Sequence, residues 1–310
     1  MPTEFHRWNG EELRLFSNVT QYEGKETDAT YGWHIAYDSC LDEPIPGKPL
    51  YFILDSINHN AFCHWVYENA TWLPLFQTIR QQYPSCKLVL EDYKQYKQLF
   101  LDFYSIPNDC ICLHTEIESE NACFFHAYTS LNDPFIPPVY YKHIEEFQQQ
   151  IHRISVDKSI PILYLPRGTK ENLQGPNNRT YNIQGHLKEF VKTIGGTVYE
   201  TDKTLRIEDQ IRLVKSAKIL LLDYGSNLWV NGLFAQASQI LCLNIGWQHH
   251  SQFPSLEYIW NEIHKTNKVT QVYAYPSEQT AGDPVPLVCF HLPEILYQLQ
   301  HLFDISRNTD

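Results

Sequence analysis

Short apolar runs alternate along the chain with longer amphipathic segments, which is the pattern of buried strands connected by helices. The helix predicted over 61–82 is expected to kink at Pro74, because proline removes a backbone donor. In the first half of the chain, the predicted strands are 51–55, 87–90, 110–113 and 122–128, and the predicted helices are 61–82, 93–103 and 141–153.

The alternation resumes in the second half of the chain after a segment rich in glutamate and glutamine. Strands that recur with helices between them favour a parallel sheet covered by helices on both faces, so the predicted fold class is α/β. The predicted strands here are 161–165, 197–200, 219–223 and 239–243, and the predicted helices are 183–194, 207–214, 227–237 and 286–303.

The length of 310 residues suits two domains of ordinary size. A proline-rich segment and the helix after it lead to a predicted boundary near residue 156. We expect Rossmann-like domains at 1–155 and 156–285 and a final helical segment at 286–310. Residues 1–45 are expected to form an irregular extension with strand-like patches, which the proline cluster at 44–49 closes off.

Composition narrows the range of partners. A net charge of −12 argues against broad binding to nucleic acids or anionic membranes, since either partner needs a basic face. The eight cysteines form no C-x-x-C pair, so we expect buried free thiols in a reducing compartment. No apolar run has the length of a signal-peptide core or a membrane span. We therefore expect a cytoplasmic protein without a transmembrane segment.

The segment 218–238 combines an apolar strand, a tight polar turn and a helix start. The turn contains Tyr224, Gly225 and Ser226, and the helix after it begins near Asn227. Backbone N–H groups at such a helix start point outward along the helix dipole and suit an anion such as a diphosphate. The alternative is an ordinary connection, because many turns in α/β proteins bind nothing.

Arginines follow the strand predicted at 161–165. Arg167 and Arg179 lie in one long polar loop. Arginine holds phosphate oxygens with two parallel hydrogen bonds and stays charged at working pH, so both residues suit a nucleotide diphosphate. The alternative, a solvated loop, is about equally supported by the general behaviour of surface charges.

His64 and Glu68 have the spacing that brings side chains to one face of a helix. A carboxylate there can orient an imidazole and raise its basicity, so the pair suits a general base that acts on a hydroxyl group. The alternative is a core histidine in a helix that Trp65 and Trp72 pack. No D-x-D pattern or metal-ligand cluster accompanies the pair, and we expect no metal site.

Taken in order along the chain, these motifs resemble the glycosyltransferase 61 family. The similarity is good over 156–247, patchy over 51–82 and absent from 1–45. The family usually has histidine where this chain has Tyr224. The residues that carry the resemblance are Asn60, His64, Trp65, Glu68, Leu73, Pro74, Arg167, Arg179, Glu208, Gln210, Ser216, Ala217, Gly225, Ser226, Asn227, Leu228, Asn231 and Phe234.

The resemblance implies a GT-B fold, in which two Rossmann-like domains face each other across a cleft. It implies an inverting, metal-independent transfer of a sugar from a nucleotide-sugar donor to a glycan or glycolipid acceptor, in surface glycan or capsule synthesis, with no cofactor. His64 and Glu68 would be catalytic, and the segment 286–310 would pack back on the N-terminal domain. Donor binding would fall to Arg167, Arg179, Glu208, Gln210, Tyr224, Gly225, Ser226, Asn227 and Asn231.

Two other functions remain open at this stage. A GT-B-like nucleotide-sugar epimerase would use the same diphosphate site and need no acceptor. A catalytically inactive module would bind the sugar without transferring it. Plant and animal members of the family are membrane-anchored Golgi proteins, so the resemblance also implies a bacterial or viral member, or a shortened chain.

Overall fold

The computed structural model divides the chain into two compact units. Unit 1 comprises residues 1–150 with 253–255, and unit 2 comprises 151–252 with 256–310. The division lies a few residues before the boundary expected near 156. The structure describes residues 6–8, 11–27, 30–40, 47–55, 62–90, 95–117, 123–128, 138–166, 180–181, 183–200, 205–244, 254–274, 287–288 and 290–307.

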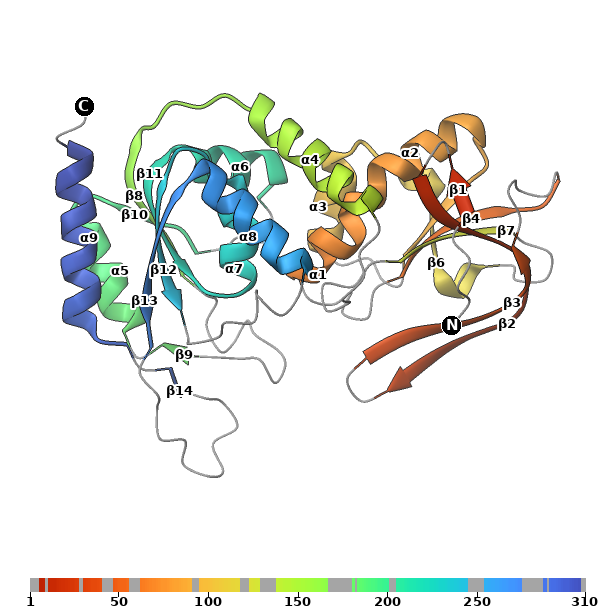
Figure 1. Ribbon diagram of the computed structural model, residues 1–310, viewed down its shortest axis with the longest axis horizontal. Coiled ribbons are helices and arrows are strands. Elements are labelled where there is room, and N and C mark those ends of the chain that lie inside the picture. Colours follow the sequence, from red (N-terminus) through yellow and green to blue (C-terminus); the bar gives the residue numbers. More distant parts are fainter. Residues whose placement is uncertain are drawn as a thin grey trace. The chain divides into compact units, whose positions relative to one another are not determined.

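Unit 1 contains one mixed sheet in the order β1-β2-β7-β4-β5-β6, with β3 paired to β2 (Figure 1). Strands β7, β4, β5 and β6 are parallel to one another, and the pairs β1–β2, β2–β3 and β2–β7 are antiparallel. The strands are β1 (His6–Trp8), β2 (Glu11–Thr27), β3 (Thr30–Cys40), β4 (Leu50–Asp55), β5 (Lys87–Leu90), β6 (Ile111–Leu113) and β7 (Cys123–Tyr128).

The N-terminal extension was expected to be irregular apart from strand-like patches, and the structure has the strands β1, β2 and β3 there. Strands β2 and β3 pair along most of their length, with a register shift between Val19 and Gln21. Only the weak alternation near Gly32–Tyr37 hinted at strands, because pairing between two chain neighbours needs no apolar run. This ribbon extends the sheet beyond β7, so the unit is more than a parallel α/β domain.

The helical segment after β4 changes its geometry before Pro74. Pro74 lies in the first turn of an α-helix, where proline costs no hydrogen bond, so the expected kink precedes it. The core of the segment is aromatic, with Trp65, Trp72 and Phe76 almost fully buried. The segment comprises α1 (Phe62–His64), the π-helical η1 (Trp65–Asn69), the 3-10 turn η2 (Ala70–Trp72) and α2 (Leu73–Gln82), and the other helices of unit 1 are α3 (Gln95–Phe103), the 3-10 turns η3 (Asn108–Cys110) and η4 (His114–Glu116), and most of α4 (Pro138–Arg153).

Unit 2 is built on a parallel five-stranded sheet in the order β10-β8-β11-β12-β13. Counted along the unit, this is the doubly wound order 2-1-3-4-5. The prediction of an α/β class with parallel sheets is therefore confirmed, and unit 2 is compatible with a Rossmann-like fold. Its strands are β8 (Ile160–Leu165), β10 (Thr197–Val198), β11 (Ala217–Asp223), β12 (Gln239–Asn244) and β13 (Lys268–Tyr273).

Helices cover both faces of this sheet (Figure 1). Strand β11 is buried along almost its whole length, as the apolar run Ile219–Leu222 predicts for a strand between two helical layers. Helices α5 and α9 share one apolar cluster with the sheet, and α6, α7 and α8 lie on the other side. These helices are α5 (Gln184–Thr193), α6 (Ile207–Lys215), α7 (Ser226–Phe234), α8 (Pro254–Thr266) and α9 (Leu292–Arg307), and a separate short pair joins β9 (Thr180–Tyr181) to β14 (Leu287–Val288).

The C-terminal helix α9 packs on the sheet of its own unit. Ile295, Leu299 and Leu302 point into the cluster that includes Ile219 and Leu241. The resemblance implied that this helix would pack on the N-terminal domain instead. Its apolar stripe predicts that it covers a sheet but does not specify which one. In the described part of the chain, no helix combines the length and the apolar character needed to cross a membrane.

Candidate functional site

The doubly wound order places a switch point between β8 and β11. From β8 the chain passes through α5 to β10 on one side, and from β10 it passes through α6 to β11 on the other. In sheets of this kind, ligands bind outside the carboxyl ends of the strands at such a point. The carboxyl ends here are Leu165 on β8 and Asp223 on β11. The turn selected from the sequence begins directly after Asp223.

Gly225 gives this turn its shape. Its backbone has φ 120° and ψ −151°, a combination that is open essentially to glycine alone. The Tyr224 N–H donates to Leu243 O at 3.0 Å, which ties the turn to β12. The first helical bond runs from the Trp229 N–H to Gly225 O, also 3.0 Å.

Helix α7 therefore starts immediately after the turn, at the carboxyl ends of the strands. The N–H groups of Ser226 and Asn227 precede the first intrahelical bond, so they need a partner outside the helix. Ser226 is exposed and Asn227 is partly exposed. The positive end of the helix dipole adds to the attraction for an anion at these groups.

A row of amide side chains fixes this helix start against β8. The Gln210 Nε2 donates to Asn231 Oδ1 at 2.9 Å, and the Asn231 Nδ2 donates to Asn227 Oδ1 at 2.6 Å. The Asn227 Nδ2 in turn donates to Leu165 O. Three of the residues predicted to bind the nucleotide-sugar donor are thus hydrogen-bonded in a row that ends at β8.

The other residues predicted to bind the sugar donor are not part of this amide row. Glu208 is substantially exposed and forms an ion pair with Arg206, with 3.7 Å between Nη2 and Oε2. Arg167 and Arg179 lie outside the described residues. Tyr224 is buried, and its ring packs edge-on against Trp229 with 5.8 Å between centroids.

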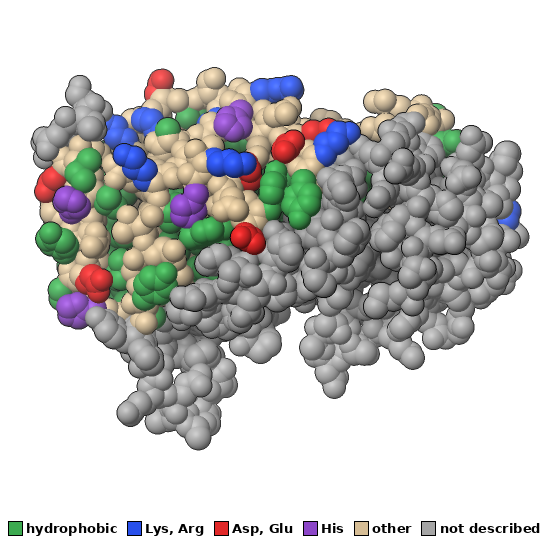
Figure 2. All heavy atoms as spheres, in the orientation of Figure 1, with side chains coloured by type: hydrophobic (Ala, Val, Ile, Leu, Met, Phe, Trp, Pro, Cys, Tyr) green, Lys and Arg blue, Asp and Glu red, His purple; other side chains and the backbone are tan. Residues whose placement is uncertain are grey.

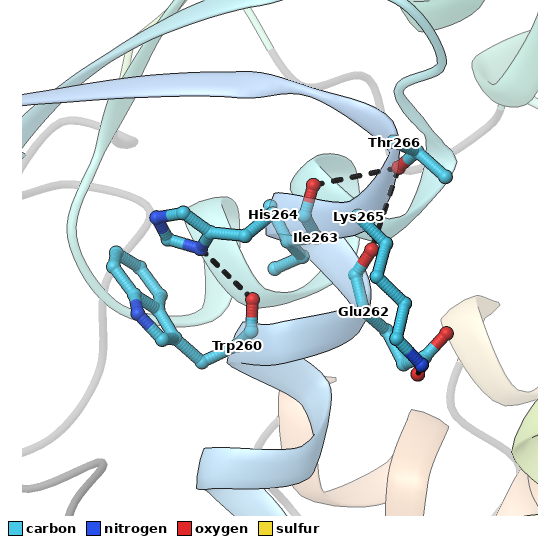
Figure 3. A network of polar contacts seen from close by, with 6 residues as sticks. All are labelled: Trp260, Glu262, Ile263, His264, Lys265 and Thr266. Atoms are coloured by element: carbon cyan, nitrogen blue, oxygen red, sulfur yellow. Dashed lines mark hydrogen bonds and ion pairs between the residues drawn. The ribbon is translucent and has the colours of Figure 1, made fainter.

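The aromatic contact at Tyr224 extends to α8. Trp229 packs against Trp260, again with 5.8 Å between ring centroids. The rings of Trp260 and His264 have their centroids 4.3 Å apart (Figure 3). The His264 Nδ1 lies 2.9 Å from Trp260 O, and because a carbonyl only accepts, Nδ1 carries the hydrogen. This row was not predicted, because α8 itself was missed and the contacts join residues far apart in the sequence.

Helices α7 and α8 also meet at Gly232, where an added side chain would lie tightly against Ile263. A Cβ on Gly232 would lie 3.0 Å from Cδ1 of Ile263. Side-chain interactions lie in the last turn of α8 (Figure 3). Lys265 pairs with Glu262, and the Thr266 Oγ1 donates to Glu262 O at 3.4 Å. The two helices behind the turn are therefore closely packed at Gly232.

In unit 1, the structure brings His64 and Glu68 together as predicted. The His64 Nδ1 lies 2.8 Å from Glu68 Oε1, the His64 side chain is 22% exposed and Glu68 is fully buried. A carboxylate only accepts, so Nδ1 carries the hydrogen and Nε2 is the basic nitrogen. The pair follows β4, which lies between β7 and β5 and so forms the switch point of this unit.

The residues next to this pair are polar and buried, which the sequence analysis did not predict. Asn69 is fully buried, and neither atom of its side-chain amide has a hydrogen-bond partner in the described structure. Lys97 is 1% exposed, and its Nζ lies 5.1 Å from the ring centroid of Trp65. Unsatisfied buried amides are costly, and single π-helical turns occur often at functional sites. The segment 64–69 therefore differs from an ordinary core helix in its π-helical backbone and in its unsatisfied buried amide.

Charges of both signs are interspersed on the face of unit 2 that Figure 2 shows. Among the described residues, no group of three or more His, Cys, Asp or Glu side chains is arranged to hold a metal ion. The cysteines Cys63, Cys86, Cys110, Cys112 and Cys242 are buried free thiols, as expected. Comparison of the chain with protein-family models and with curated proteins finds no match.

Proposed function

We propose that this chain is an inverting glycosyltransferase that moves a sugar from a nucleotide-sugar donor to a hydroxyl group of a glycan or glycolipid acceptor. The proposal includes a GT-B arrangement, in which the two units face each other and unit 2 holds the donor. It also includes independence from metal ions. The resemblance to the glycosyltransferase 61 family suggested this function, and the geometry of the turn at 224–227 supports it.

The observation that carries the proposal is the start of α7 at the switch point of unit 2. A nucleotide sugar leaves a diphosphate when its sugar is transferred, and that leaving group needs donors and positive charge. The N–H groups of Ser226 and Asn227, at the positive end of α7, are suitable donors. Arg167 follows Leu165 by two residues, and the Leu165 carbonyl accepts a hydrogen bond from Asn227. The last residue of β8, Leu165, therefore lies beside the helix start.

Arg167 and Arg179 would supply the positive charge. Guanidinium groups bind diphosphate oxygens with two parallel hydrogen bonds and remain charged throughout the working pH range. In this proposal Tyr224 has a packing role, since its buried ring contacts Trp229. The histidine that the family usually has at this position is therefore replaced by a residue that stabilises the turn.

His64 is the proposed general base. As the acceptor oxygen forms its bond to the anomeric carbon, its proton passes to the Nε2 of His64, and the bond from that carbon to the diphosphate oxygen breaks. Attack from the face opposite the diphosphate inverts the configuration. Glu68 holds the imidazole through Nδ1 and stabilises the cation that forms.

A mass-spectrometric screen of nucleotide sugars with glycan acceptors tests this proposal. Transfer to an acceptor, with release of the nucleoside diphosphate and no loss of rate in EDTA, is the expected result. Interconversion of the free nucleotide sugar would favour an epimerase. Saturable binding without either reaction, at any acceptor, would favour an inactive sugar-binding module.

A further inference from the structure

The amide row at the start of α7 has one possible direction. The Leu165 carbonyl can only accept, so Asn227 must turn its Nδ2 toward β8 and its Oδ1 toward Asn231. Asn231 then donates from Nδ2 and accepts on Oδ1, so the residue at 210 must be a donor. The hydrogen-bond network itself therefore assigns which end of each amide is nitrogen.

We propose that Gln210 and Asn231 are positioning residues, which act through Asn227 to hold the first turn of α7 against the end of β8. The inference rests on the proposed function, because it concerns the same diphosphate site. Gln210 is 9% exposed and Asn231 is 5% exposed. Both side chains are nearly buried and hydrogen-bonded in the row, so in this proposal they orient Asn227 and do not themselves contact the donor.

The direction of the row requires a hydrogen-bond donor at position 210, and a single substitution removes that donor. In Gln210→Glu, an ionised carboxylate has no hydrogen to donate and its oxygen meets Asn231 Oδ1. A protonated carboxyl restores the donor and closes the row. The carboxyl is therefore protonated more readily in the folded chain than in the unfolded chain, so the stability it supports is present at low pH and lost as pH rises.

Among the described residues around position 210, ionisable side chains lie on α6, on β11 and at Arg206, which precedes α6 and pairs with Asp209. Helix α7, which carries Asn231, has no ionisable side chain. Strand β11, which also contacts α6, carries Lys218 and Asp223. The ionisable side chains of α6 itself are Glu208, Asp209, Arg212 and Lys215. All are shared by the wild type, so the difference between variant and wild type isolates the introduced carboxyl.

The experiment measures thermal unfolding and pyrophosphate affinity at pH 5.5 and pH 8 in magnesium-free buffer. At pH 8, Gln210→Glu should unfold about 3–8 °C below wild type and bind pyrophosphate about tenfold more weakly than wild type. At pH 5.5 the affinity difference should largely disappear, because the folded carboxyl is then protonated, while the difference in unfolding temperature should shrink without vanishing, because an unfolded glutamate, with a pKa of about 4.3, still ionises there. Asn231→Asp should show the same rescue, because it too loses a donor when ionised, and it serves if the first variant does not fold.

Two control variants separate polarity from packing and from charge. Gln210→Met removes the donor without a titratable group, so its deficit should not change with pH. Gln149→Glu adds the same charge at an exposed position on α4, and should match wild type at both pH values.

Three results would overturn the inference. Deficits in Gln210→Glu and Asn231→Asp that do not change with pH would mean that the row lacks the assigned polarity. Stability that recovers at low pH while pyrophosphate affinity does not would limit Gln210 to a structural role. Wild type that binds no pyrophosphate at either pH would remove the diphosphate site itself, which is the separate failure of the proposed function.

Discussion

Replacing Gly225 by alanine tests whether the turn before α7 depends on its unusual backbone. At φ 120° and ψ −151°, a residue with a Cβ is strained by about 1–3 kcal/mol, whatever space surrounds it. For a unit of this size, about 2 kcal/mol corresponds to a fall of roughly 4–8 °C in Tm. The strain would be relieved by movement of the Ser226 and Asn227 N–H groups, so pyrophosphate binding should weaken as well.

Gly185→Ala is the matched control for this variant. Gly185 lies in α5, its φ is not positive, and a Cβ there would meet nothing within 4 Å. Alanine in a helix is favoured over glycine by up to about 1 kcal/mol, so the Tm of this variant should equal or exceed that of wild type. Calorimetric unfolding of the three proteins, followed by pyrophosphate titration, makes the comparison. Equal Tm and affinity for Gly225→Ala and wild type would refute the reasoning.

Three further predictions concern other groups. His64→Ala should lower turnover about 10²–10⁴-fold while donor affinity is preserved, and near-normal turnover would remove His64 from the role of base. Burial, with Lys215 nearby, lowers the pKa of Lys158 from 10.5 to about 8, so the unfolded chain binds more protons between these values. The free energy of unfolding of the wild type, relative to that of Lys158→Met, should therefore rise from pH 8 to 10.5. The same pH dependence of this free energy in both proteins would contradict the prediction. Burial also raises the pKa of the Cys63, Cys86 and Cys242 thiols, so mass-spectrometric mapping at neutral pH should find them alkylated only after unfolding; rapid labelling of the native chain would show that they are accessible.

The elements that define unit 2 could be predicted because their signals are local. The apolar run ending at Asp223, the glycine at 225 and the helical spacing after it are sufficient for a strand, a turn and a helix start, and the structure has all three. The contact of His64 with Glu68 also follows from spacing alone. In each case the deciding interactions lie within a few residues along the chain.

The features that were missed depend on contacts between distant segments. Gln210 and Asn231 meet only because α6 and α7 pack side by side, and no spacing rule predicts that their amides form a row with Leu165. No strand or helix was predicted between residues 243 and 286, so α8 and β13 were both missed. The ribbon of β2 and β3 carries no continuous apolar run, so it was interpreted as irregular.

The destination of α9 illustrates the same limit. The spacing of Ile295, Leu299 and Leu302 predicts an apolar stripe that must cover something. Each unit has its own main sheet, and the stripe is equally suited to either. Packing against β8, β11 and β12 decides the matter in the structure.

The account depends most directly on the N–H groups at the start of α7. Amide NMR spectra of the chain during titration with a nucleoside diphosphate report on Ser226 and Asn227 individually. The account predicts that both signals shift saturably with the diphosphate, and that the free nucleoside shifts neither. Saturable shifts confined to other residues, with Ser226 and Asn227 unchanged, would contradict the assignment of this turn as the diphosphate site.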